Sequence, residues 1–486
     1  MPTKNQTISF VLDGKIVEID FLKSNLRPTH TLLHYLRSLP NHKGTKEGCS
    51  EGDCGACTVA IGELDNENKI NYKSIDSCLV FLPMIHGKQV ITIENIAETK
   101  DGKPILHPLQ EAMVFENGTQ CGFCTPGFIM SLFSLYKNFD NPTPQIIKNE
   151  LSGNLCRCTG YNSIFKATQK AFKEKKADHF TAEEASIAVL LKKINTKQTI
   201  YIITDEQVYI KPFTLKETLE IKNKFPQALI VSGATDCALR VTKKHEILPL
   251  IIDISDVEEI KPLKKQGNTI VVGSATKLEV IKNASEKDLT ALFDMLTVFG
   301  SRQIRNLATL GGNVGSASPI GDTLPLLLAY GASVNLESIN GKRTMLLSDF
   351  IVDYRKTQIL PNELITAVSI PIPDKDVIVR SYKISKRKDL DISTVSACFR
   401  LKLKNDTVEE IVMAYGGMAA FAKRAQAAET FLKNKKWNAP TILEAVTYIE
   451  KDFAPISDAR SGKEMRMIAA GNLLQKFYND TLIEKQ

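Results

Sequence analysis

The stretch Gly48-Cys49-Ser50-Glu51-Gly52-Asp53-Cys54-Gly55-Ala56-Cys57 decides how the first part of this chain folds. It has no hydrophobic periodicity, so it is predicted to be a loop, and its cysteines follow a C-x4-C-x2-C spacing. Cys78 follows further along the chain. Three thiolates from one wrapping loop and a fourth from elsewhere are the ligand pattern of a plant-type [2Fe–2S] cluster. The three glycines let the loop turn and bring backbone N–H groups toward the cluster sulfurs.

The alternative for these four cysteines is a structural zinc site. Zinc sites usually combine one C-x2-C pair with a second such pair, and this pattern does not. The spacing therefore favours iron–sulfur, and the predicted ligands are Cys49, Cys54, Cys57 and Cys78.

A second set of cysteines follows, as Cys121-x2-Cys124 and then Cys156-x-Cys158. A C-x-C pair is unusual for zinc, because its two thiols lie too close together for an ordinary knuckle. After a plant-type cluster motif, this second set predicts a second [2Fe–2S] cluster. The two remaining cysteines, Cys237 and Cys398, are interpreted as small buried hydrophobic residues.

Composition excludes several classes of protein. The chain has 486 residues, enough for several domains, and 43% hydrophobic with 24% charged residues is ordinary for globular proteins. The net charge of 62 − 55 = +7 is spread along the chain, which argues against a nucleic-acid binder. No apolar run reaches the ~18–20 residues of a membrane span, and the first residues lack the apolar region of a signal peptide. We therefore expect a cytoplasmic protein with reduced thiols.

Periodicity suggests five segments. Alternating residues at 7–12 and 15–20 around Asp13-Gly14 predict a β-hairpin, and helical spacing takes over after Pro108. Short buried strands are expected at 229–231, 250–252 and 270–272. The expected domains are a small mixed sheet with one helix over 1–94, a helical bundle over 95–175, a charged linker with some helix over 176–204, and α/β segments over 205–375 and 376–486.

Two loops of small residues stand out in the second half of the chain. The strand at 229–231 runs into Ser232-Gly233-Ala234-Thr235-Asp236, and a second loop is Thr309-Leu310-Gly311-Gly312-Asn313-Val314-Gly315. Loops of small residues with free N–H groups form concave sites suited to a pyrophosphate. A structural turn remains the alternative for each loop alone. No G-x-G-x-x-G motif follows a strand, so a Rossmann dinucleotide site is not indicated.

The strings Gln120-Cys121-Gly122-Phe123-Cys124-Thr125-Pro126-Gly127 and Asn154-Leu155-Cys156-Arg157-Cys158-Thr159-Gly160-Tyr161 carry a resemblance. With the plant-type motif before them, they resemble the iron–sulfur portion of the molybdenum hydroxylases, the family of xanthine dehydrogenase and aldehyde oxidase. The resemblance implies a multidomain α+β fold. Its expected parts are a β-grasp [2Fe–2S] domain, a four-helix [2Fe–2S] domain, a vanillyl-alcohol-oxidase-type FAD domain and a C-terminal α/β flavoprotein domain.

The same resemblance implies which residues meet the cofactors. The second cluster would be held by Cys121, Cys124, Cys156 and Cys158, with Gln120 against a pterin on another chain. The loop at 386–392 matches one beside the flavin, where NAD would dock. The residues expected to contact FAD are Leu229, Ile230, Val231, Ser232, Gly233, Ala234, Thr235, Asp236, Phe299, Thr309, Leu310, Gly311, Gly312, Asn313, Asp322, Ile365 and Lys383.

Nothing in the sequence resembles the molybdopterin-binding domains, so no catalytic residue at molybdenum is expected on this chain. The resemblance thus implies the small electron-transfer subunit of a xanthine dehydrogenase. It would pass electrons from purine hydroxylation on a molybdopterin-binding large subunit through two [2Fe–2S] clusters to FAD and then NAD+, in a dimer of heterodimers or a larger complex. The alternatives are a related hydroxylase acting on aldehydes or N-heterocycles, and a zinc-stabilised interaction module without a redox role.

Overall fold

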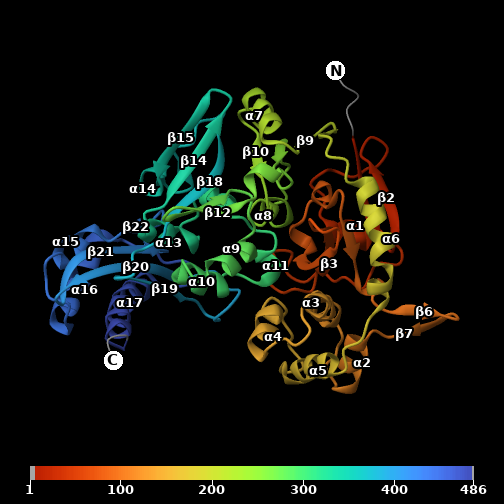
Figure 1. Ribbon diagram of the computed structural model, residues 1–486, viewed down its shortest axis with the longest axis horizontal. Helices are drawn as coiled ribbons and strands as arrows, with labels where there is room; N and C mark the ends of the chain where they lie inside the picture. The colour runs from red at the N-terminus through yellow and green to blue at the C-terminus, as the bar shows by residue number, and fades with distance from the viewer. Residues whose placement is uncertain (1–5, 484–486) are drawn as a thin grey trace. The chain divides into compact units, whose positions relative to one another are not determined.

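The computed structural model describes residues 6–483, and the chain divides into two compact units (Figure 1). The first unit comprises the described residues of Met1–Thr214, together with Gln227–Asp256 and Ser301–Ala308. The second comprises Leu215–Pro226, Val257–Gly300 and the described residues of Thr309–Gln486. Both contain helices and sheets, and the multidomain α+β architecture expected from the sequence is confirmed.

A five-stranded sheet opens the first unit. Strands β1 (Thr7–Leu12) and β2 (Lys15–Asp20) form the predicted hairpin, and both turn residues, Asp13 and Gly14, have positive φ, as a two-residue hairpin turn requires. The sheet order is β2-β1-β5-β3-β4, with β1 and β5 parallel. This is the expected β-grasp arrangement. Its other elements are α1 (Leu32–Ser38), β3 (Thr58–Leu64), β4 (Ile70–Asp76) and β5 (Gln89–Ile91).

Four helices follow a small exposed hairpin, and they make the predicted helical bundle. Helix α3 is buried from Gly127 to Tyr136, since it packs on β3 and β4 of the first sheet as well as on its neighbouring helices. Pro126 and Pro144 lie in first helical turns, where proline costs no hydrogen bond. The elements are β6 (Glu98–Lys100), β7 (Lys103–Ile105), α2 (Pro108–Phe115), α3 (Thr125–Asn138), α4 (Pro144–Leu151) and α5 (Asn162–Lys173).

Helix α6 (His179–Ile194) occupies most of the stretch expected to be a charged linker. Its buried residues Phe180, Ile187 and Leu191 recur at helical spacing and join the core that the bundle shares with the first sheet. In Figure 1 this helix, drawn in yellow, runs beside the red strands of that sheet. The lysines and glutamates of α6 are exposed or half-buried, and the helix is docked on the bundle and the first sheet.

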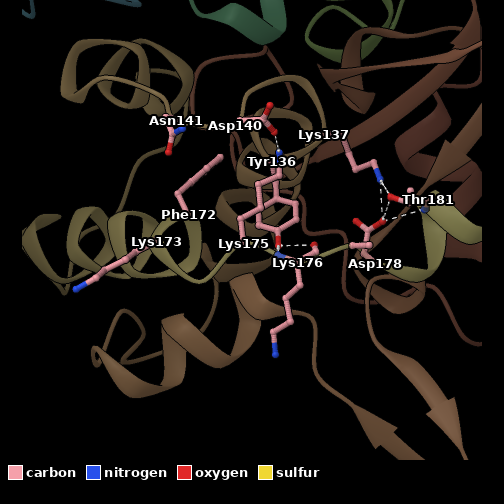
Figure 2. A pocket seen from close by; sticks show the side chains of 11 residues that line it. Tyr136, Lys137, Asp140, Asn141, Phe172, Lys173, Lys175, Lys176, Asp178 and Thr181 are labelled. Carbon is pink, nitrogen blue, oxygen red and sulfur yellow. Dashed lines mark hydrogen bonds and ion pairs between the residues drawn. The ribbon is translucent and has the colours of Figure 1, made fainter.

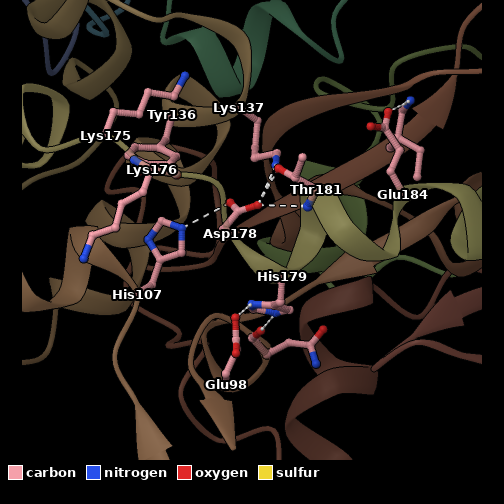
Figure 3. A network of polar contacts seen from close by, with 12 residues as sticks. Glu98, His107, Tyr136, Lys137, Lys175, Lys176, Asp178, His179, Thr181 and Glu184 are labelled. Carbon is pink, nitrogen blue, oxygen red and sulfur yellow. Dashed lines mark hydrogen bonds and ion pairs between the residues drawn. The ribbon is translucent and has the colours of Figure 1, made fainter.

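Asp178, the N-cap of α6, holds that helix to the bundle (Figure 3). Its carboxylate accepts hydrogen bonds from Lys137 Nζ at 2.7 Å and from the Thr181 N–H at 3.0 Å. His107 Nδ1 accepts from the Leu109 N–H, so the ring proton lies on Nε2, which donates to Asp178 at 3.3 Å. Burial opposes ionisation of Asp178, but these partners outweigh it and hold its pKa well below the usual range.

A second sheet of the first unit has the order β10-β11-β9-β8, and its three strands β10, β11 and β9 are parallel. Lys211 at the end of β9 is fully buried, and its Nζ lies 2.9 Å from Asp253 and 2.7 Å from Asp256. Lys88, which precedes β5 of the first sheet, lies 3.7 Å from the same Asp256. The elements are β8 (Ile200–Ile203), β9 (Val208–Lys211), β10 (Leu229–Val231), α8 (Ala238–Thr242), β11 (Leu250–Asp253) and α11 (Arg302–Arg305).

The second unit contains an antiparallel five-stranded sheet, of order β12-β13-β18-β14-β15, with helices packed against it. The predicted strand at 270–272 is confirmed. The elements are α7 (Leu215–Lys224), β12 (Leu263–Gln266), β13 (Thr269–Gly273), α9 (Leu278–Ser285), α10 (Thr290–Thr297), α12 (Leu310–Ser316), α13 (Thr323–Tyr330), β14 (Ser333–Ser338), β15 (Gly341–Leu346), α14 (Leu347–Phe350), β16 (Ile351–Asp353), β17 (Lys356–Thr357) and β18 (Leu364–Pro371).

The same unit ends in an antiparallel sheet of order β19-β20-β21-β22, with α15 and α17 packed on its strands and α16 between these two helices. Its core includes Phe399, Tyr415, Trp437 and Phe477. Among residues 6–483, no helix is both long and apolar enough to cross a membrane. The elements are β19 (Val377–Ile384), β20 (Val395–Lys404), β21 (Thr407–Gly416), β22 (Lys423–Arg424), α15 (Gln426–Leu432), α16 (Ala439–Asp452) and α17 (Lys463–Ile483).

Replacing Asp178 should release the start of α6. Asp178→Ala removes the N-cap and leaves Lys137 and His107 without their shared acceptor, a loss of about 1–3 kcal/mol in local stability. Amide hydrogen exchange of a peptide covering α6 should become faster. The control is Asp140→Ala, whose side chain is 91% exposed and pairs only with Lys175 among the described residues. Equal exchange in the two variants would contradict the docking role of Asp178.

Candidate functional site

The first four cysteines meet in two pairs. Cys57 Sγ lies 3.4 Å from Cys78 Sγ, just beyond the end of β4, and both side chains are buried. Cys49 and Cys54, from the loop before β3, share a side-chain hydrogen bond. The backbone N–H of Asp53 points at Cys49 Sγ from 3.2 Å, which is the N–H to sulfur contact expected from the loop's tight turns.

The second four cysteines also meet in two pairs. Cys121 Sγ lies 3.5 Å from Cys158 Sγ, and Cys124 shares a hydrogen bond with Cys156. One member of each pair comes from the segment before α3 and the other from the segment before α5. Cys121 and Cys158 are exposed, whereas the other two are partly buried.

The paired thiols fit the ligand pattern of a [2Fe–2S] cluster. Two sulfurs bound at ~2.3 Å to one tetrahedral ion lie about 3.8 Å apart. The separations of 3.4 Å and 3.5 Å within pairs are close to that value. Across the described part of the chain, no three histidine, cysteine or acidic side chains converge on one ion position. Each iron of a two-iron cluster takes two protein thiolates.

The thiols within a pair differ in acidity. A hydrogen bond from Cys49 lowers the pKa of Cys54 to about 6, and the same bond raises the pKa of Cys49. Burial, followed by the hydrogen bond with Cys156, raises the pKa of Cys124 to about 12. Metal binding needs thiolates, so the ligand sets must lose these protons when a cluster forms.

Asp76 is a buried carboxyl group beside the first cysteine set. Its Oδ1 lies 3.5 Å from Cys57 Sγ, and its side chain is almost inaccessible. Burial, followed by the nearby Cys49, raises the pKa of Asp76 to about 8. Asp76 stands two residues before Cys78, outside the cysteine pattern that predicts the ligands.

The first loop of small residues follows β10 in the first unit. Gly233 has no room for a side chain, because a Cβ would overlap the carbonyl oxygen of Leu307. Ala234 has a φ of 59°. The Ser232 hydroxyl is buried and has no hydrogen-bond partner among the described residues. An unsatisfied donor in a loop of small residues is what a polar ligand such as a pyrophosphate would satisfy.

The second loop of small residues, in the second unit, is a helix. The sequence predicted a loop over 309–315, but α12 begins at Leu310 because Thr309 caps it, accepting a hydrogen bond from the Gly312 N–H at 3.1 Å. Neither Gly311 nor Gly312 has a positive φ. Gly311 is needed for packing, because its Cβ would lie 2.7 Å from the Ser274 carbonyl oxygen. The buried Ser274 hydroxyl has no partner among the described residues.

Other residues expected at the flavin gather in the same unit. Asp322, the N-cap of α13, lies 3.0 Å from Lys383 Nζ, and both side chains are about 95% buried. Lys383 also donates to the carbonyl of Val298, next to the half-buried Phe299. Ser393 donates to the second oxygen of Asp322 at 2.6 Å. The charges of Asp322 and Lys383 thus satisfy each other.

Two further expected residues lie close to these. Asn313 accepts a hydrogen bond from Thr323, which follows Asp322. The side chain of Ile365 in β18 would be 3.4 Å from a Cβ at Gly315. The loop at 386–392 returns to Gly300, because the buried Leu390 adopts a φ of 71° and donates its N–H to the Gly300 carbonyl at 3.2 Å.

One open pocket of about 490 Å³ lies on the first unit, between the ends of α3 and α5 and the start of α6 (Figure 2). Four lysines and two aspartates line it, and two of these lysines are paired, Lys137 with Asp178 and Lys175 with Asp140. None of the cysteines and none of the expected flavin contacts lines this pocket.

Three protein families match the chain. The [2Fe-2S] binding domain matches residues 92–169, and the FAD binding domain in molybdopterin dehydrogenase matches residues 203–373. The CO dehydrogenase flavoprotein C-terminal domain matches residues 380–481. The matched order, iron–sulfur and then flavin, is the order in which the two cysteine sets and the loops of small residues occur.

Several relatives of this chain are xanthine dehydrogenases. The xanthine dehydrogenase of Emericella nidulans and the xanthine dehydrogenase/oxidase of Mus musculus are each 30% identical over 98% of this chain. That of Drosophila subobscura is 33% identical over 84% of it. The chain spans 39%, 39% and 34% of the length of these three relatives. The chain belongs to the molybdenum hydroxylase family.

Solved structures share the fold of part of this chain. A carbon monoxide dehydrogenase from Hydrogenophaga pseudoflava has a TM-score of 0.54 at 22% identity, over 56% of this chain and 96% of its own. Quinoline 2-oxidoreductase from Pseudomonas putida 86 has a TM-score of 0.52 at 23% identity, over 56% and 94%. This chain is thus an iron–sulfur and FAD-binding electron-transfer component of a molybdenum hydroxylase.

The sequence analysis missed the residues that join the parts of this component. Ser131, Asn154 and Gln303 form one buried polar cluster, and Ser274 and Ser393 stand beside expected flavin contacts. Asn154 lies in the string that carries Cys156 and Cys158, but only the side-chain partners of Asn154 and Gln303, which lie far away in the sequence, reveal their position.

The two glycines of α12 should respond differently to substitution. Gly311→Ala forces a Cβ against the Ser274 backbone and should lower the stability of the second unit by about 1–3 kcal/mol. Gly312→Ala meets only Thr309 Oγ1, at 3.0 Å, and alanine favours a helix, so its stability should be unchanged or slightly higher. Thermal unfolding of the full chain measures both. A similar loss of Tm in the two variants would contradict this difference.

Proposed function

We propose that this chain is the electron-transfer subunit of a xanthine dehydrogenase. It would receive electrons from the hydroxylation of hypoxanthine and xanthine to urate on a molybdopterin-binding partner, and deliver them to NAD+. The observation that carries the proposal is the occurrence of two sets of four cysteines, each resolved into close pairs, in a chain with a FAD binding domain. The xanthine dehydrogenases among its relatives support the substrate.

The residues that would hold the cofactors are those expected from the sequence. The first cluster would bind Cys49, Cys54, Cys57 and Cys78, and the second the cysteines from 121 to 158. The clusters would carry single electrons and the flavin two, which is what links a two-electron hydroxylation to a two-electron acceptor. The loops at 229–236 and 309–313 would hold the FAD pyrophosphate. Phe299, Asp322, Ile365 and Lys383 would lie around the flavin.

The surface near the second cysteine set supports the position of the partner. Cys121 and Cys158 are exposed, and Phe123 and Tyr161 beside them are 49% and 44% exposed. Apolar side chains gathered around exposed thiols are costly in water and suit a covered interface. We propose that the molybdopterin subunit covers this surface, with the exposed Gln120 directed at its pterin. We also propose that two such heterodimers associate into a dimer or a larger complex.

We also propose where NAD+ meets the flavin and that the protein acts in the cytoplasm. The loop at 386–392 would border the place where NAD+ meets the flavin. Ten free cysteines suit the reducing cytoplasm.

We further propose the domain boundaries given by the sequence pattern, with iron–sulfur domains over 1–94 and 95–175 and flavin domains over 205–375 and 376–486. The alternative substrates remain aldehydes and N-heterocycles, which assay of the assembled complex would distinguish from purines.

Single cysteine variants test the two cluster sites. Cys54→Ser should remove one [2Fe–2S] signal from the electron paramagnetic resonance (EPR) spectrum of the reduced full chain and keep the other, and Cys156→Ser should do the reverse. Analysis of the unmodified chain should find about four irons with acid-labile sulfide. Zinc without flavin would instead support the interaction module. Loss of both signals from one folded variant would overturn the two separate sites.

Activity of the full chain tests the division of labour. With FAD bound, the chain alone should oxidise NADH with an artificial dye and should not oxidise xanthine. Adding the molybdopterin partner should restore xanthine-dependent reduction of NAD+. Xanthine turnover by the pure chain without molybdenum would contradict the subunit assignment. A chain that binds FAD but does not reduce the dye with NADH would contradict NAD+ as the acceptor.

A further inference from the structure

Residues 153–155 lie directly against the loop of the first cysteine set. The Leu155 N–H donates to the carbonyl oxygen of Cys54 at 3.0 Å, and Asn154 Nδ2 donates to the carbonyl oxygen of Gly55 at 3.1 Å. Leu155 is bonded to Cys156. One hydrogen bond therefore joins a cysteine of the first set to the residue next to a cysteine of the second.

This approach of two backbones depends on missing side chains. Gly55 has a φ of 68°, and a Cβ on it would lie 2.5 Å from Asn154 Nδ2 and would overlap the Gly153 carbonyl oxygen. A Cβ at Gly127, in the first turn of α3, would overlap the carbonyl oxygen of Gly55. The cysteine sets are thus brought together at a contact of glycines, where small changes in backbone position cannot be absorbed by side chains.

The amide of Asn154 is held in one orientation. Its Oδ1 accepts hydrogen bonds from Ser131 Oγ at 2.6 Å and from Gln303 Nε2 at 2.9 Å. Two donors on the oxygen leave Nδ2 to face Gly55. All three side chains of this cluster are at most 3% exposed, so water cannot replace a lost partner.

Gln303 reaches this cluster from α11, a part of the flavin-binding match that packs in the first unit. Arg302 lies 2.7 Å from the buried carboxylate of Glu150, and Asn306 Nδ2 donates to the Ser74 carbonyl at 2.8 Å. Both flanks of Gln303 are therefore anchored to the iron–sulfur domains, and its amide is fixed where it orients Asn154.

We propose that Asn154, oriented by Gln303 and Ser131, is a positioning residue that sets the separation of the two cysteine sets and so the coupling between the clusters they hold. The proposal rests on the function proposed above. Among the described residues, the hydrogen bonds of the Asn154 side chain go to no cysteine sulfur, but they fix the two backbones through which the sets are joined. Residues that orient ligands in this way change the affinity or activity of metal sites by about 10–100-fold when they are replaced.

The test compares Asn154→Ala and Gln303→Met with a matched control in the full chain. Methionine keeps the length of Gln303 but donates no hydrogen bond. The control is Asn138→Ala, since Asn138 Nδ2 also donates from α3 to a carbonyl of the first sheet, that of Tyr72, at 2.7 Å. After chemical reduction, EPR records both cluster signals and the magnetic splitting between them. Hydrogen exchange of a peptide covering 151–156 reports on the Leu155 N–H.

Asn154→Ala and Gln303→Met should keep both signals and the full iron content, while the splitting shrinks and the Leu155 amide exchanges about tenfold faster or more. Asn138→Ala should change neither. Unchanged splitting in both test variants, or an equal change in the control, would overturn the proposal. If Asn154→Ala binds no clusters, Gln303→Met decides alone. An unmodified chain that lacks iron would refute the proposed function instead, before any variant is compared.

Discussion

Four close pairs of cysteine sulfurs constrain the first unit, since each proposed cluster would need thiols from segments that are separate in the sequence. Cys57 meets Cys78 only because β3 and β4 pair and bring their outer ends together. Cys121 meets Cys158 only because α3 and α5 belong to one bundle. The pairs therefore form only when the sheet and the bundle are folded. Cluster binding would in turn stabilise both, because a ligand that binds the folded state and not the unfolded state increases the stability of the folded state.

The first sheet is joined to the flavin-binding region by buried charges as well as by apolar packing. Lys211 neutralises Asp253 and Asp256, and Lys88 links Asp256 to Glu63. A buried ion pair adds little net stability, but removing one partner is expensive because the other charge stays buried. Such a network favours one arrangement of these two parts over others in which the same charges would be unpaired. Since electron transfer depends on fixed distances, a specific arrangement serves this component better than a merely stable one.

The sequence predicted local features well and long-range contacts poorly. The Asp13-Gly14 hairpin follows from a short-range rule, and the structure confirms it. The prolines in the first turns of α3 and α4 obey a rule of the same kind. The helix at 310–316 was missed because its glycines resemble a turn, whereas Thr309 caps it and Gly311 packs on Ser274. The segment at 176–204 looked like a linker because its charges hide a narrow apolar stripe. The roles of the cysteines and flavin contacts remain predictions.

The position of α11 shows why the flavin-binding region and the iron–sulfur domains act as one component. Gln303 is the only donor from outside the iron–sulfur domains that is seen, within residues 6–483, to reach Asn154 Oδ1. A chain carrying the eight cysteines but not residues 301–308 would keep the Ser131 bond to Asn154 and lose the second donor. The amide could then rotate away from Gly55. The flavin-binding region thus does more than hold its own cofactor, since it also fixes the contact between the two cysteine sets from which it would receive electrons.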